Sequence, residues 1–157
     1  MAQERVSVLI VDDDNDIARS LSMVLESEGY QTAVANTIKE AIEKSYENYY
    51  NLAILDIKLP DGEGTSLLKK LREISPKTLK IMLTGYPMLK NAVDSLNDGA
   101  DAYLIKPVDL EKLIETIEIK IEEQKANETT TEDSIADFLQ SRTKKLLDRK
   151  KSFSSNL

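Results

Sequence analysis

The stretch NLAILDIKLPDGEG, residues Asn51–Gly64, decides how the rest of the chain is interpreted. Its apolar run Leu52–Leu55 is typical of a buried strand, and this run ends at a single carboxylate, Asp56. A proline and two glycines follow within the stretch, which indicates a loop before the next helix. In open α/β sheets, ligands bind beyond the carboxyl ends of the strands. The function therefore depends on which other groups the chain brings to the same edge.

The composition predicts a soluble globular protein. Of its 157 residues, 41% are hydrophobic and 31% are charged, which is enough for a sizeable core. The longest apolar run is only a few residues and the first residues do not form a secretory signal, so we expect a cytoplasmic protein without membrane insertion. The chain has no cysteine and no histidine, which excludes disulfides, thiolate or imidazole metal sites, and Ser-His or Cys-His catalysis.

The net charge of −7 is unevenly distributed along the chain. Residues 126–157 contribute a net charge of +1, which leaves −8 for residues 1–125. An acidic body repels the phosphate backbone, so we do not expect nucleic acid as a partner of the main domain.

Five apolar runs alternate with five segments of helical periodicity. The runs are Val6–Val11, Thr32–Ala35, Leu52–Leu55, Leu79–Leu83 and Ala102–Ile105. The helical segments follow them, ending at Gly29 and Pro76 in two cases, covering residues 87–97 in a third, and beginning at Asp109 in the last. Such alternation predicts an α/β fold with a doubly wound, five-stranded parallel sheet covered by five helices. Asp14 is a candidate cap for the first helix, and Asn36 or Thr37 for the second.

The pattern also predicts how the chain divides. We expect a main domain over residues 1–124, a polar linker over 125–131, and a partly helical tail over 132–157. The tail is too short for a winged helix or a helix-turn-helix module. Three interpretations stay open for it: a solvated segment, an amphipathic helix that docks on a partner, or a basic segment that contacts nucleic acid or anionic lipid.

Polar groups follow four of the five predicted strands at the points where these strands end. Asp12 and Asp13 follow the first strand, Asp56 the third, Thr84 the fourth and Lys106 the fifth. At about 4 Å and an effective dielectric near 20, each pair of like charges costs on the order of 4 kcal/mol, which a hard cation would relieve. Oxygen ligands with room for water favour Mg²⁺. A carboxylate beside Mg²⁺, an ammonium group and a hydroxyl is the set required to capture a phosphoryl group.

The segments that carry these groups resemble the receiver domain of two-component response regulators. The resemblance covers residues 5 to about 124, and its motifs are VLIVDDD (Val8–Asp14), AILDIKLPDGEG (Ala53–Gly64), IMLTG (Ile81–Gly85) and GADAYLIKP (Gly99–Pro107). Each motif alone is weak, whereas the ordered set is strong. The resemblance implies a flavodoxin-like sheet with strand order 2-1-3-4-5, an expectation carried over from the family.

The resemblance also implies a role for each residue at the site. Asp56 would be the phospho-acceptor, taking phosphate from a histidine of a sensor kinase or a histidine phosphotransfer protein. Mg²⁺ would be bound by Asp13 directly, by Asp12 mainly through water, by Asp56, and by the backbone carbonyl of Lys58. Lys106 would pair with the phosphoryl group, and its bond to Pro107 is expected to be cis. The protein would catalyse only its own phosphorylation and dephosphorylation, so it would not be an enzyme acting on other substrates.

Two further residues would form the switch of such a domain. Thr84 would move toward the new phosphate, and Tyr103 would turn inward behind it. This two-state equilibrium would change the face formed by the fourth helix, the fifth strand and the fifth helix, and a downstream protein would bind there.

Two other classes of function compete with this interpretation. In the first, the protein is a small transcriptional or nucleic-acid regulator whose output is the tail, residues 132–157. In the second, it is an Asp-dependent phosphatase of the haloacid dehalogenase type, since Asp12-Asp13-Asp14 contains two acids spaced two apart. The second alternative would leave the segment around Asp56 without a role.

Overall fold

The computed structural model describes residues 5–85, 99–128 and 140. Five parallel strands form one sheet in the order β2-β1-β3-β6-β7, which confirms the predicted order 2-1-3-4-5. These strands are β1 (Ser7–Val11), β2 (Gln31–Ala35), β3 (Leu52–Leu55), β6 (Leu79–Thr84) and β7 (Ala102–Ile105). Each begins and ends within one residue of its predicted bounds.

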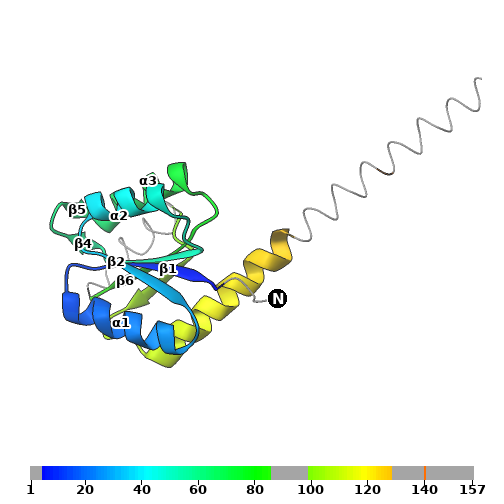
Figure 1. The fold of residues 1–157 in the computed structure, drawn as a ribbon, viewed down its shortest axis with the longest axis horizontal. Helices are drawn as coiled ribbons and strands as arrows, with labels where there is room; N and C mark the ends of the chain where they lie inside the picture. The colour runs from blue at the N-terminus through cyan, green and yellow to red at the C-terminus, as the bar shows by residue number, and fades with distance from the viewer. Residues whose placement is uncertain (1–4, 86–98, 129–139, 141–157) are drawn as a thin grey trace, which may run out of the picture. The chain divides into compact units, whose positions relative to one another are not determined.

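Helices cover both faces of the sheet. They are α1 (Asn15–Ser27), α2 (Ile38–Glu47), α3 (Gly64–Ile74) and a helix over residues 110–128. Figure 1 shows α2 and α3 on one face, and α1 with the beginning of the helix 110–128 on the other. The doubly wound α/β architecture is therefore confirmed, with four helices in the described residues, while the predicted helix 87–97 lies outside them. None of the described helices is long and apolar enough to span a membrane.

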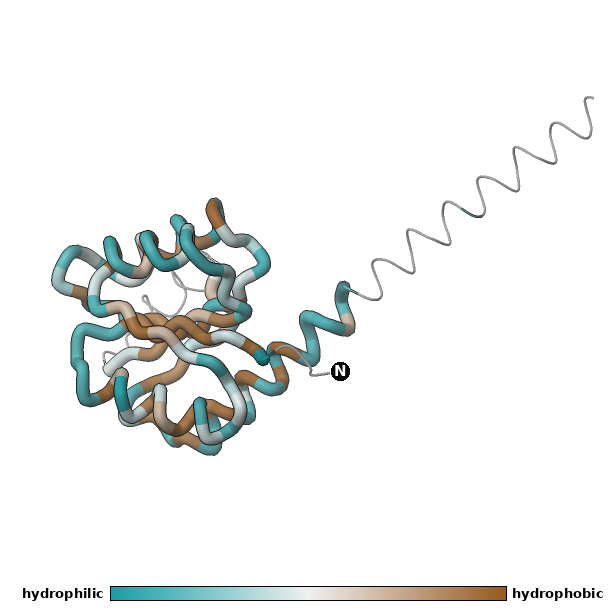
Figure 2. Tube along the Cα trace, viewed as in Figure 1, coloured by the Kyte–Doolittle hydropathy of each residue, from teal (hydrophilic) through white to brown (hydrophobic). Residues whose placement is uncertain are grey.

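The strands are buried because their side chains are apolar on both faces, as parallel strands between two helical layers require. All four residues of β3 and all six of β6 are buried. Figure 2 shows these strands as the most hydrophobic part of the fold, with helices that alternate between apolar and polar residues. One core cluster joins α3 to the sheet through Leu67, Leu68 and Leu71 on the helix and Met82 on β6.

The structure differs from the sequence-based prediction in two places. A two-stranded antiparallel ribbon, β4 (Lys58–Leu59) and β5 (Gly62–Glu63), stands in the predicted loop after Asp56. The last helix continues to residue 128, through the first four residues of the segment 125–131 predicted as a linker. Lys, Ala and Glu in that segment are good helix formers, so the polar composition does not end the helix.

The chain divides into two compact units, residues 1–118 and residues 119–157. The remaining residues of the predicted linker, and all of the tail except residue 140, lie outside the described part of the chain.

Candidate functional site

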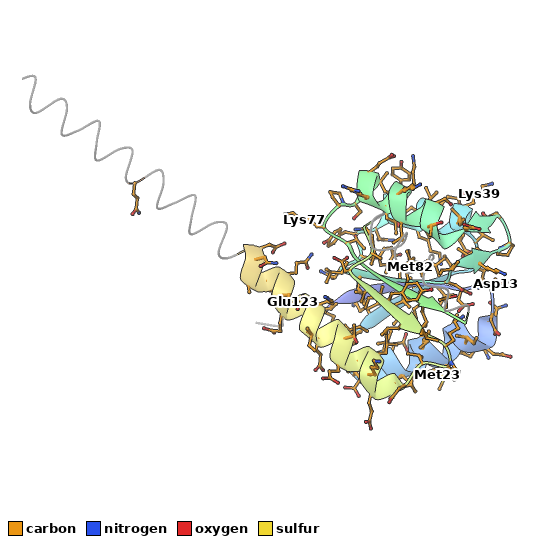
Figure 3. The ribbon with its side chains drawn as sticks, turned by 180° about the vertical axis from the view of Figure 1, so that it is seen from behind. Asp13, Met23, Lys39, Lys77, Met82 and Glu123 are labelled. Carbon is orange, nitrogen blue, oxygen red and sulfur yellow. The ribbon has the colours of Figure 1, made fainter. Side chains whose placement is uncertain are left out.

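The sheet brings the predicted polar groups to its carboxyl edge. The pairing of Val11 with Leu55 in adjacent strands places Asp12 next to Asp56, whose N–H donates to the Val11 carbonyl at 3.0 Å. On the other side of β3, β6 and β7 end together, and the Lys106 N–H donates to the Thr84 carbonyl at 2.7 Å. In Figure 3, Asp13 lies at one end of the sheet, Met82 near its middle and Lys77 at the opposite end.

Asp12 is the most buried acid of the cluster, with 3% of its surface exposed. One carboxylate oxygen, Oδ2, lies 2.7 Å from the Lys106 ammonium nitrogen. The other, Oδ1, accepts the Asp14 N–H at 2.9 Å. The Asp12 backbone is also fixed, because its N–H donates to the Ala35 carbonyl and its own carbonyl accepts the Asn36 side-chain amide. This acid therefore has a fixed position and conformation.

Lys106 links the carboxylates of Asp12, which is buried, and Asp56, which is half-buried. Its ammonium nitrogen lies 2.7 Å from Asp12 Oδ2 and 3.3 Å from Asp56 Oδ2. Burial by itself would lower the pKa of Lys106, but the hydrogen bonds and charges of Asp12 and Asp56 outweigh it, so the pKa lies above its ordinary value. Lys106 is therefore a permanent cation inside the acidic cluster. The peptide bond between Lys106 and Pro107 is cis, as the resemblance implied.

Asp56 occupies an environment that disfavours its negative charge. Burial raises its pKa, and the nearby charge of Asp12 raises it further. Lys106, through its charge and its hydrogen bond, and the Lys58 backbone N–H act in the opposite direction, but the net pKa stays above the ordinary value. A second positive charge at this position would favour the ionised carboxylate.

The acids fit a divalent cation that prefers oxygen ligands. Asp12, Asp13 and Asp56 each offer a carboxylate oxygen, and these atoms lie within 4.8 Å of one another. Asp13 is exposed, so this side of the cluster is open to solvent. Hard cations such as Mg²⁺ and Ca²⁺ bind carboxylate oxygens and retain water on their open side.

Comparison with known proteins agrees with this geometry. A model of the response regulator receiver domain matches residues 8–118. The chain belongs to the response regulator receiver domain family. Its curated relatives include the transcriptional regulatory protein ZraR of Klebsiella oxytoca, which is 34% identical over 139 residues. That match covers 88% of this chain but 31% of ZraR, so the receiver chain spans about a third of the length of this relative.

Solved structures share the receiver fold over most of their length. A CheY-like receiver domain protein from Methanospirillum hungatei JF-1 is 48% identical, with a TM-score of 0.77 over 79% of this chain and 99% of that one. A response regulator from Burkholderia pseudomallei is 30% identical, with a TM-score of 0.68 over 75% of this chain and 72% of that one. The latter structure contains a phosphorylated aspartic acid, a calcium ion and citrate.

The structure also places the two predicted switch residues of the receiver. Thr84 ends β6 and is fully buried, with its carbonyl bonded to the Lys106 N–H. Tyr103, on β7, is partly buried against the core cluster, and this burial raises the pKa of its hydroxyl. Both residues thus lie on the two strands that end beside Lys106.

Asp14 has a structural role. It is the N-cap of α1, and its carboxylate accepts the N–H groups of Asp16 and Ile17 at 3.0 and 3.2 Å. This is the capping role that the sequence offered for Asp14. Asp14 is the second acid of the Asp-x-Asp pair that a haloacid dehalogenase type of site would need. Its capping role explains its presence without such a site.

Two residues near the site have roles that the sequence pattern did not reveal. Thr37, not Asn36, is the N-cap of α2, and the Asn36 amide instead donates to the Asp12 carbonyl at 2.9 Å. Asp61, in the predicted loop, accepts two backbone N–H groups of α2. The position of Asn36 could have indicated its role, because it follows β2 at the edge where the acids follow β1 and β3. The role of Asp61 could not be found from a local pattern, because its partners are more than 20 residues away in the sequence.

Proposed function

We propose that this receiver accepts a phosphoryl group on Asp56 from a phosphohistidine of another protein. The observation that carries the proposal is the position of the Asp56 carboxylate, 3.3 Å from the Lys106 ammonium and within the cluster of three acids at the carboxyl edge. These 157 residues contain no histidine, so the donor histidine lies outside them, which fits a kinase or phosphotransfer protein.

In the proposed reaction an oxygen of the Asp56 carboxylate attacks the phosphorus atom of the donor. An O–P bond forms, the P–N bond to the imidazole breaks, and the imidazole leaves with a proton from solvent. Lys106 supplies positive charge to the phosphoryl oxygens, and the Thr84 hydroxyl donates a hydrogen bond to one of them. Later attack by water on phosphorus releases inorganic phosphate and restores the carboxylate.

We propose Mg²⁺ as the cofactor, held by Asp13, Asp12, Asp56 and the Lys58 carbonyl. When bound, it would neutralise negative charge on the transferring group. The protein supports this assignment in two ways: its acids converge within 4.8 Å, and Asp13 leaves the cluster exposed on one side. The Lys58 N–H already donates to the Asp56 carboxylate, so the Lys58 backbone lies against the acceptor.

An apolar groove next to the site offers a contact for the donor. Its volume is about 560 Å³, and it runs between α1 and the segment after β7. Its apolar lining residues are Ile17, Leu21, Leu83, Pro107, Val108 and Leu110, and Lys106 also lines it. A donor that brings its histidine to Asp56 must cover this surface, and the burial of apolar side chains would stabilise the encounter.

We propose that the signal leaves through protein–protein contacts on the face that contains β7. Ile105, at the end of β7, is 52% exposed, and Leu110, at the start of the helix 110–128, is 39% exposed. Two exposed aliphatic side chains beside the acceptor site favour a partner that offers an apolar surface, as proteins do, over a highly charged partner.

The name of the ZraR relative favours a second candidate, transcriptional output. In that case the part of the chain beyond the receiver, including residues 132–157, would carry or join the output. Removal of residues 129–157 tests it, because the truncation keeps the described helix intact. Loss of target binding in the truncated protein favours tail output, and retained binding favours the receiver face.

The decisive experiment is intact-mass analysis after incubation with acetyl phosphate and Mg²⁺. We expect a gain of one phosphoryl group in the wild type, no gain in Asp56→Asn, and no gain when EDTA replaces Mg²⁺. A gain that persists in Asp56→Asn would place the acceptor elsewhere. No gain in the wild type would refute phosphoryl acceptance from this donor.

A further inference from the structure

The turn of the β4–β5 ribbon is attached to a distant helix through Asp61. One carboxylate oxygen of Asp61 accepts the Ile38 N–H at 2.9 Å, and the other accepts the Lys39 N–H at 3.0 Å. These N–H groups belong to the first two residues of α2. They lower the pKa of Asp61, so the carboxylate is ionised at neutral pH and faces the positive end of the helix dipole.

This arrangement differs from the capping of α1. In α1 the N-cap residue Asp14 satisfies two N–H groups of its own helix. The N-cap residue of α2, Thr37, satisfies only one, the Glu40 N–H at 3.0 Å. The first two N–H groups of α2 are therefore bonded by a residue 22 and 23 positions away in the chain. Asp14 bonds the N–H groups of the second and third residues of α1, whereas Asp61 bonds those of the first and second residues of α2. The N-terminus of α2 thus combines a local cap with a distant acid.

The turn fits closely against α2. A side chain at Gly62 would bring its Cβ atom within 2.9 Å of Ile38 Cδ1, so glycine allows this approach. On the other strand of the ribbon, Leu59 is buried in the core cluster. Figure 3 shows Lys39 at the same end of the molecule as Asp13. The Asp61 bonds thus fix the outer end of the ribbon next to the acidic cluster.

The inner end of the same ribbon contacts the acceptor. The Lys58 N–H donates to the Asp56 carboxylate, and Lys58 pairs with Glu63 across the ribbon. Gly64 follows directly, and a Cβ atom there would overlap the Asp56 carbonyl oxygen. Lys58 therefore lies between two fixed points, the acceptor on one side and the Asp61 anchor on the other.

We propose that Asp61 is a positioning residue, which holds the β3–α3 loop, residues 56–63, in the conformation that presents the Lys58 backbone to Asp56 and to a bound Mg²⁺. This inference rests on the proposed function for its Mg²⁺ site. Asp61 would act through the backbone of the loop and would not touch the cation. Loss of such indirect support weakens metal binding in other proteins by about 10–100-fold.

The chain offers a matched control. Asp61→Ala and Thr37→Ala each remove N-terminal hydrogen bonds of the same helix, but only Asp61→Ala detaches the loop. Both are to be made in the full chain, together with Asp61→Asn, which keeps one accepting oxygen. Two quantities are measured: the Kd for Mg²⁺ by calorimetry, and hydrogen exchange of the loop amides without metal. Thermal unfolding of each variant shows how much stability the lost cap costs.

We expect Asp61→Ala to weaken Mg²⁺ binding about tenfold and to speed amide exchange in residues 57–63, with Asp61→Asn in between. Thr37→Ala should lose a similar amount of stability but change the Kd less than about twofold. Equal Mg²⁺ affinity in Asp61→Ala and Thr37→Ala would overturn the positioning role. If the wild type bound no Mg²⁺, the proposed function would fail. Hydrogen exchange would still test whether Asp61 holds the loop, because unchanged loop exchange in Asp61→Ala would contradict that role.

Discussion

Replacing the proposed acceptor Asp56 by asparagine should stabilise the metal-free protein. The Asp12 and Asp56 oxygens lie within 4.8 Å, a repulsion on the order of 3 kcal/mol at an effective dielectric near 20. Lys106, at 3.3 Å from Asp56, returns about 5 kcal/mol at the same dielectric. Removing a carboxylate from water costs several kcal/mol more. With a desolvation cost of about 4 kcal/mol, the ionised group destabilises the fold by about 2 kcal/mol. The asparagine amide keeps an oxygen that can accept the Lys58 N–H.

The pH dependence of this effect has a definite sign. The pKa of Asp56 is raised in the fold, so the folded state holds its proton to higher pH than the unfolded state does. Wild-type stability relative to Asp56→Asn should therefore fall as pH rises from the ordinary aspartate pKa, about 3.9, to the raised value, and stay constant above it.

Urea unfolding in EDTA at several pH values measures the difference directly. Asp16→Asn is the control, because it removes an exposed acid from the first turn of α1 and should cost a few tenths of a kcal/mol. Adding Mg²⁺ should stabilise the wild type by about 2.7 kcal/mol at one hundred times its Kd, and Asp56→Asn by less. If Asp56→Asn were less stable than the wild type in EDTA at neutral pH, the pairing with Lys106 would outweigh burial, contrary to this prediction.

Three further variants test other parts of the structure. Gly64→Ala places a Cβ atom against the Asp56 carbonyl and should cost about 2–3 kcal/mol of unfolding free energy in urea. Gly85→Ala is the control and should cost less than about 1 kcal/mol, because its Cβ meets no atom closer than 4.0 Å. Equal losses would show that the contact at Gly64 relaxes freely. Asp14→Ala removes the cap of α1 and should cost about 1 kcal/mol in the same assay; no loss would mean that water replaces the cap. Burial lowers the pKa of Lys80. The stability of the wild type relative to Lys80→Met should therefore rise as the pH rises from this lowered pKa toward the ordinary lysine pKa of about 10.4. A constant difference in unfolding free energy over that pH interval would contradict the prediction.

The strands and the acidic edge could be predicted from the sequence because they depend on local patterns. Continuous apolar runs such as Leu52–Leu55 have few alternatives to a strand buried on both faces, and β3 begins and ends at those residues. Parallel strands then place their last residues at one edge, so Asp12, Asp56 and Lys106 meet although 50 residues separate Asp56 from Lys106. The order of the strands came from the family resemblance.

The ribbon after Asp56 could not be predicted in the same way. Two strands of two residues each are too short to give a periodic signal, and proline with glycine fits many kinds of turn. The partners of Asp61 depend on how α2 packs beside the loop, which is a property of the tertiary structure. The extension of the last helix through residues 125–128 was also missed, because the polar residues of an exposed helix resemble those of a linker in composition.

The groups that give the receiver site its proposed chemistry also destabilise the fold. Asp12 is buried and Asp56 half-buried at the edge of an apolar sheet, and both burial and the charge of Asp12 oppose the negative charge of Asp56. Lys106 relieves part of this cost in the absence of metal, and its raised pKa keeps it charged for that purpose. A carboxylate held in this way gains more from added positive charge than an exposed one does, because the interaction is less screened. The residual cost explains why Asp56→Asn should stabilise the fold and abolish phosphorylation at the same time, and both results in one variant would separate a functional acid from a structural one.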